Sequence, residues 1–139
     1  MSSRLEEKEE KILRVLERLT GESAKGKPII VEGKNDTATL RALGVEGEII
    51  SAKTGGKSLL DVIYEVKKSK TQEAILLLDF DRRGKELTKL LKQNLEKAKM
   101  KPNLTFWTKL LELVGREVKD VEGLVTYMET LKRKIGRST

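Results

Sequence analysis

Three carboxylates that directly follow predicted strands are the residues of this sequence best placed to do chemistry. Glu32 follows the apolar run 29–31, and the pair Asp79 and Asp81 follows the apolar run 74–78. Residues two apart in extended chain point the same way, so the two aspartates can aim at one point. Converging carboxylates repel one another unless a divalent cation lies among them. The pattern therefore predicts a site for Mg²⁺, with Mn²⁺ as the second choice.

The complete absence of cysteine and histidine supports that choice of metal. The 139 residues contain neither amino acid. Thiol nucleophiles, disulfides, iron–sulfur clusters and cysteine-ligated zinc are thereby excluded. Serine–histidine–aspartate triads and histidine-ligated zinc are excluded as well. The remaining chemistry belongs to carboxylates, lysines, hydroxyls, backbone amides and a hard metal ion with oxygen ligands.

The charge balance indicates an anionic partner. Lys and Arg number 29 against 22 Asp and Glu, which gives a net charge of +7. Such a balance favours nucleic acid, DNA or RNA, and secondly an anionic membrane surface. The alternative is a solvated surface of the kind that thermophile proteins carry. No apolar run approaches the roughly 20 residues that span a bilayer, and residues 1–10 are polar. We therefore expect a cytoplasmic protein without a membrane partner.

Alternating apolar patterns predict the elements that would position these carboxylates. Short β-branched runs indicate buried strands, and apolar residues at helical spacing indicate amphipathic helices. Gly21 is expected to end the first helix. The order favours an α/β domain with a largely parallel sheet. The predicted strands are 29–31, 48–51 and 74–78, and the predicted helices are 5–19, 36–43, 58–68 and 86–99.

The last third of the chain is less regular. Residues 106–114 have helical spacing, and Asp120 is a plausible N-cap for a final helix. A short edge strand is expected around Val118, which would give a sheet of about four strands. We divide the chain into an N-terminal helical extension, 1–26, and one domain, 27–139. The apolar stripe of the extension permits either packing on the domain or homodimer formation.

Two features carry alternative interpretations. The segment 51–58, SAKTGGKS, follows a strand and opens a helix as a phosphate-binding loop does, but Ser51 replaces the first glycine. It is either a nucleotide-binding loop or an anion-binding corner for a phosphodiester, with Lys53 and Lys57 adding charge. Asp36 and Asp81 could also serve simply as helix N-caps.

The motifs IIVEGKND (29–36) and LLLDFDRRG (76–84) resemble the signature of the Toprim domain. This domain is shared by topoisomerases, bacterial primases and some nucleases. The nearest likeness is to small stand-alone Toprim proteins of archaea. The resemblance implies a Rossmann-like Toprim fold over 27–139, with its core motifs in 27–100 and helices at both ends of the chain.

The resemblance also implies roles for individual residues. Glu32 corresponds to the catalytic glutamate, which also contacts metal, and Asp79 and Asp81 correspond to the Mg²⁺ ligands. Arg83 stands where topoisomerases often have a third acid. The candidates for binding phosphate or nucleic acid, chosen by position and charge, are Lys34, Lys53, Lys57, Arg82 and Arg83.

The implied function is Mg²⁺-dependent phosphoryl transfer on nucleic acid, by a small nuclease or processing factor. Topoisomerase strand passage and full primase activity need further domains that 139 residues cannot contain. The alternative is a non-catalytic Toprim module that binds metal and nucleic acid within an RNA or DNA processing assembly.

Overall fold

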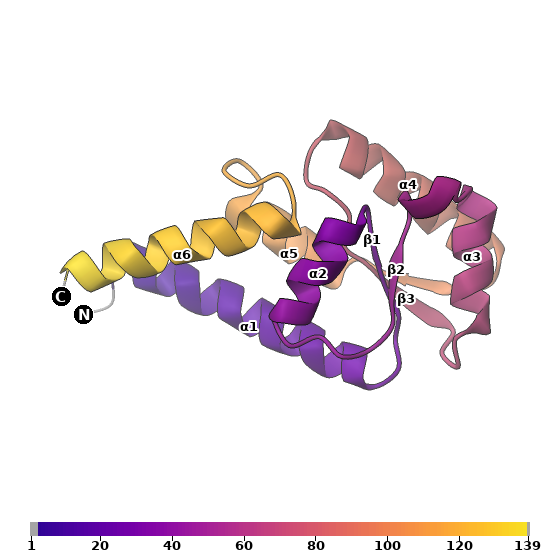
Figure 1. The fold of residues 1–139 in the computed structure, drawn as a ribbon, viewed down its shortest axis with the longest axis horizontal. Coiled ribbons are helices and arrows are strands. Elements are labelled where there is room, and N and C mark those ends of the chain that lie inside the picture. The colour runs from indigo at the N-terminus through magenta and orange to yellow at the C-terminus, as the bar shows by residue number, and fades with distance from the viewer. Residues whose placement is uncertain (1–2, 139) are drawn as a thin grey trace.

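Four short strands form one parallel sheet in the computed structural model, which describes residues 3–138 (Figure 1). Their spatial order is β2-β1-β3-β4, so β1 and β3 are central. Ile29 pairs with Ile49 on one side and with Ile75 on the other. The strands are β1 (Ile29–Val31), β2 (Ile49–Ser51), β3 (Glu73–Leu76) and β4 (Lys101–Asn103).

Helices alternate with the strands and cover both faces of the sheet, as the sequence pattern predicts. Two longer helices form the N- and C-terminal ends of the described chain, and the short turn η1 (Thr54–Gly56) follows β2. The helices are α1 (Arg4–Ala24), α2 (Lys34–Ala42), α3 (Leu59–Lys68), α4 (Arg82–Lys97), α5 (Thr105–Val114) and α6 (Val121–Ser138). This is an α/β arrangement with a parallel sheet, as predicted.

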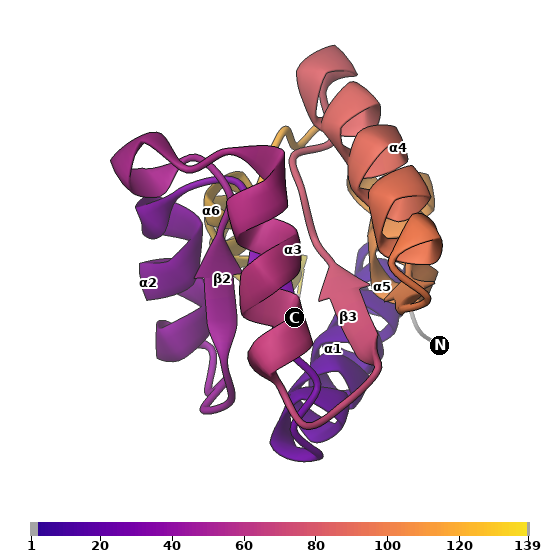
Figure 2. The same ribbon diagram turned by 90° about the vertical axis from the view of Figure 1, so that its right-hand side faces the viewer.

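Two apolar cores lie on opposite faces of the sheet because side chains alternate along each strand. Ile29 and Val31 point into the core formed with α1, α2, α5 and α6. Ile30 points into the core formed with α3 and α4. In Figure 2, α3 lies in front of the sheet, α4 lies along its flank, and α1 lies behind it.

The N-terminal helix shares the larger core with the rest of the chain. Ile12 and Leu19 of α1 are fully buried there, together with Leu110 of α5 and Leu124 of α6. α1 and α6 lie in contact and extend side by side beyond the sheet (Figure 1).

The expected end of the first helix at Gly21 is wrong, since α1 continues to Ala24. A glycine in a helix interior costs about 1 kcal/mol. Burial of Leu19 just before Gly21 and the ion pair between Glu22 and Lys27 at 2.7 Å just after it outweigh that cost. The chain instead turns at Gly26, whose φ of 95° lies in the left-handed region that glycine tolerates best.

The fourth strand lies elsewhere than expected. β4 is Lys101–Asn103, whereas Val118 is buried in the connection between α5 and α6. β4 contains Pro102, and proline has no N–H to donate to the ladder. An edge strand tolerates that loss, and β4 is at the edge.

α4 begins four residues earlier than its apolar pattern indicates. It starts at Arg82, since Asp81 is its N-cap and accepts a hydrogen bond from the Gly84 N–H at 2.8 Å. The polar first turn carries no apolar periodicity to reveal it. The cap fixes where the helix begins relative to the end of β3.

No helix among residues 3–138 is long and apolar enough to cross a membrane.

Candidate metal centre

Glu32, Asp79 and Asp81 meet at the carboxyl edge of the two central strands, as the sequence predicts. Each offers one carboxylate oxygen, and the three oxygens lie within 4.8 Å of one another. Glu32 comes directly after β1, and the two aspartates follow the apolar run that begins in β3. The parallel pairing of β1 with β3 brings the two motifs together across 47 residues of sequence.

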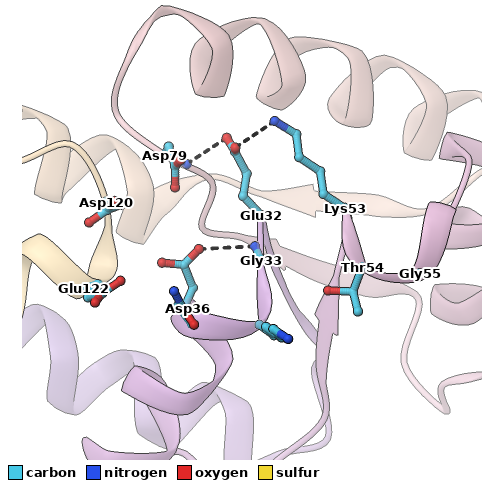
Figure 3. Close-up of a pocket in the computed structure, with 11 residues that line it drawn as sticks. Glu32, Gly33, Asp36, Lys53, Thr54, Gly55, Asp79, Asp120 and Glu122 are labelled. Atoms are coloured by element: carbon cyan, nitrogen blue, oxygen red, sulfur yellow. Dashed lines mark hydrogen bonds and ion pairs between the residues drawn. The ribbon is translucent and has the colours of Figure 1, made fainter.

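Glu32 is held at both carboxylate oxygens (Figure 3). Its Oε1 accepts a hydrogen bond from the Asp79 backbone N–H at 3.3 Å, and its Oε2 lies 3.1 Å from the Lys53 Nζ. The residue is only 7% exposed. The carboxylate is therefore fixed in place before any metal binds.

The backbone at Asp79 is fixed from two sides. The Trp107 indole N–H donates to the carbonyl of Leu78 at 2.9 Å and more weakly to that of Asp79 at 3.4 Å. Gly84, in the first turn of α4, packs so tightly on Asp79 that a Cβ there would collide with the Asp79 carbonyl. The close approach of α4 to this strand end requires glycine at that position.

Asp81 combines two roles. Its Oδ1 caps α4, as described above, so the structural alternative for this residue is confirmed. A carboxylate has further lone pairs, and Asp81 also offers an oxygen to the cluster. The expected N-cap role of Asp36 is wrong: Gly33 caps α2, and Asp36 accepts from the Gly33 N–H at 3.2 Å.

A cleft of about 550 Å³ opens beside the cluster, and its walls carry acids that sequence reasoning did not assign to the site. Asp36 comes from the first turn of α2, and Asp120 and Glu122 come from the start of α6 (Figure 3). Asp36 lies only four residues after Glu32, and this short spacing indicates that the two acids lie at the same edge of the sheet. The two acids of α6 could not be placed without knowing how α6 packs on α2.

This concentration of carboxylates changes their protonation. Burial raises the pKa of Asp79 to about 7, and the neighbouring carboxylate of Glu32 adds to the shift. Burial also raises the pKa of Asp36, assisted by the charges of Asp120 and Glu32 and opposed by the hydrogen bond from Gly33. The groups around the cluster therefore do not supply enough positive charge to neutralise its carboxylates.

The donor set fits a hard divalent cation. Its ligand atoms are all carboxylate oxygens, which Mg²⁺ and Mn²⁺ prefer. A bound cation would favour the ionised form of Asp79, whose pKa is raised by burial and by the neighbouring carboxylate of Glu32. This acidic site is therefore compatible with the binding of a divalent metal ion.

The cations expected near the site fall into two groups. Lys34 and Lys53 line the cleft. Lys57 lies apart, with its Nζ 2.9 Å from Glu65 and 3.1 Å from the Ser51 carbonyl oxygen. Arg82 and Arg83 are exposed on the first turn of α4, and Arg82 pairs with Glu86 at 3.5 Å.

Comparisons with known proteins agree with this geometry. The family model of the Toprim domain matches residues 27–111. A UPF0292 protein of Methanocaldococcus jannaschii is 40% identical over 120 residues, covering 86% of this chain and 91% of that protein. A UPF0292 protein of Methanosarcina barkeri is 36% identical over 127 residues, covering 91% and 87%.

A solved structure shows the same fold. It is a putative protein from Aquifex aeolicus, with a TM-score of 0.67 and 24% sequence identity, and the match covers 78% of this chain and 94% of that one. With the strand order, the converging acids and the matched motifs in agreement, the chain belongs to the Toprim domain family and is a relative of the archaeal UPF0292 proteins.

Proposed function

We propose that this protein is a Mg²⁺-dependent phosphoryl-transfer enzyme that acts on nucleic acid, most simply as a small nuclease or processing factor. The observation that carries the proposal is the convergence of Glu32, Asp79 and Asp81 beside an open cleft. The net charge of +7 supports a polyanionic substrate. Mn²⁺ is the second candidate for the metal.

Asp79, Asp81 and Glu32 would hold the metal, which when bound neutralises charge on a phosphodiester and on the attacking oxygen. In this proposal Glu32 would also move a proton to or from the attacking oxygen, and its Oε2 lies 3.1 Å from the Lys53 ammonium. Lys53 is placed to donate to a non-bridging phosphate oxygen. Lys34 lines the same cleft and adds charge for the substrate.

A non-catalytic Toprim module within an RNA or DNA processing assembly is the second candidate. Two observations support it: Asp81 already uses one oxygen as a helix cap, and Arg83 adds positive charge where a further acid would strengthen metal binding. Such a module would use the same carboxylates to bind metal without turnover.

Incubation with labelled single- and double-stranded DNA and RNA, in Mg²⁺, Mn²⁺ or EDTA, separates the two candidates. We expect metal-dependent cleavage that falls at least about 100-fold in Glu32→Gln and Asp79→Asn, the order of effect seen when a transition-state-stabilising group is removed. Glu46→Gln, an exposed acid outside the cleft, is the matched control and should cleave normally. Binding without cleavage of any of these substrates would leave the non-catalytic module.

A further inference from the structure

α4 carries more than half of the net positive charge of the chain. Its 16 residues contain six Lys and Arg and two Glu, a net charge of +4 out of +7. α1, by contrast, mixes acids and bases along its length. α4 is therefore an unusually basic element, and it begins directly after the metal-ligating Asp81.

The position of this charge is unfavourable for the helix itself. The first turn of a helix carries the positive end of its dipole, which favours acids there by about 0.3–1 kcal/mol each. α4 has no acid in its first turn, and Arg82, Arg83 and Lys85 lie there instead. Helix stability does not explain these cations, whereas an anionic ligand at this end of α4 does.

Four of the cations form one row. Arg82, Lys85, Lys89 and Lys92 follow the spacing i, i+3, i+7, i+10, which places them on one side of a helix. All four are exposed, and within residues 3–138 the three lysines form no ion pair. The row spans about 15 Å at 1.5 Å per residue. One strand of a DNA duplex carries about four phosphates over that length.

We propose that this row, named here the α4 track, binds the phosphodiester backbone of the nucleic acid. The inference rests on the proposed function. The backbone would run from the carboxylate cluster along the outside of α4, which begins above the sheet edge and descends its flank (Figure 2). The acidic cleft cannot hold a polyanion by itself, since six carboxylates of the site face two lysines. The α4 track supplies the missing attraction.

The test compares two triple variants that remove the same charge. The first, Lys85→Gln/Lys89→Gln/Lys92→Gln, neutralises the α4 track. The second neutralises a separate basic cleft between α1 and α5, and consists of Lys11→Gln, Arg18→Gln and Lys109→Gln. Binding of labelled 20-nucleotide single-stranded DNA and RNA and of a 20-base-pair duplex is measured by fluorescence anisotropy across a salt series, in EDTA and in Ca²⁺.

Each phosphate contact contributes about 0.7 to the log–log salt slope for single strands and about 0.9 for duplex. We expect the α4 variant to lower the slope by about 2–3 and to weaken binding at least about tenfold near 0.1 M salt. The α1–α5 variant should change affinity by less than about threefold, the effect of net charge alone. The charge-preserving variant Lys85→Arg/Lys89→Arg/Lys92→Arg should bind as the wild type does.

Equal losses of affinity in the two triple variants, or a larger loss in the α1–α5 variant, would refute the α4 track. Cleavage by the wild type would still support the proposed function in that case. Loss of binding confined to the α4 variant, in a protein that cleaves nothing, would support the track and refute the catalytic proposal. Failure of the wild type to bind any of the three probes in either buffer would refute both.

Discussion

The Lys53 ammonium lies 3.1 Å from the Glu32 carboxylate and provides positive charge beside the cluster of Glu32, Asp79 and Asp81. The two residues follow the neighbouring parallel strands β1 and β2, and they are 21 positions apart. Lys53 is about half exposed, whereas Glu32 is buried. The lysine can therefore swing away from the carboxylate at little cost, and it then faces the cleft that a phosphodiester would enter.

Substitution of Lys53 should separate metal binding from turnover. Lys53→Met removes a cation that competes for Glu32, so we expect Mg²⁺ affinity to rise by up to about 5-fold, the range of a partly exposed ion pair. Cleavage should fall despite the tighter metal, because a phosphate ligand is lost. Calorimetric Mg²⁺ titration and the cleavage assay provide the two readouts, and Lys57→Met, outside the cleft, is the control. Weaker metal binding in Lys53→Met would contradict this role.

Metal binding should depend on pH through Asp79. Its pKa of about 7 means that the residue is largely protonated at pH 6 and ionised at pH 8. Since a ligating carboxylate must be ionised, Mg²⁺ affinity should rise over this range and binding below pH 7 should release close to one proton. Titrations at pH 6 in two buffers with different ionisation enthalpies measure that proton. An equal release from Asp79→Asn would assign the proton to another group.

The metal-free protein should lose stability as pH rises. The folded-state pKa of Asp79 is raised above its ordinary value of 3.8, so its contribution to folding is greatest below pH 4 and is lost as pH rises to about 7. Asp79→Asn should flatten this dependence and stabilise the metal-free protein at pH 8 by about 1–2 kcal/mol, after discounting for solvent screening. Thermal denaturation in EDTA at pH 5 and pH 8 measures the difference. A wild type that is more stable at pH 8 would contradict it.

Two glycine substitutions should have opposite effects on stability. Gly84→Ala places a Cβ against the Asp79 carbonyl, so we expect a loss of about 1–3 kcal/mol and weaker Mg²⁺ binding. Gly21→Ala lies in the interior of α1 with no atom near the new Cβ, so we expect a gain of about 0.5–1 kcal/mol and unchanged metal binding. Chemical denaturation and Mg²⁺ titration measure both effects. Normal metal affinity in Gly84→Ala would show that α4 does not position Asp79.

The sequence by itself determined the central strands and the three carboxylates that are the candidate metal ligands, for a local reason. Ile29–Val31 and the run 74–78 are short apolar segments buried on both faces, and such runs end where the chain turns polar. Glu32, Asp79 and Asp81 are the first polar residues after those runs. Their convergence then follows from parallel pairing, which brings the carboxyl ends of strands to one edge of the sheet.

Only the tertiary structure decided which other groups surround the ligands. Asp120 and Glu122 reach the cleft because α6 packs against α2, and Trp107 reaches the end of β3 because α5 packs beneath it. The edge strand at Lys101–Asn103 and the continuation of α1 beyond Gly21 also depend on long-range packing. At Gly21 the free energy of burial outweighs a helix preference of about 1 kcal/mol, and in the other cases the contact joins elements far apart in sequence, which no pattern in neighbouring residues records.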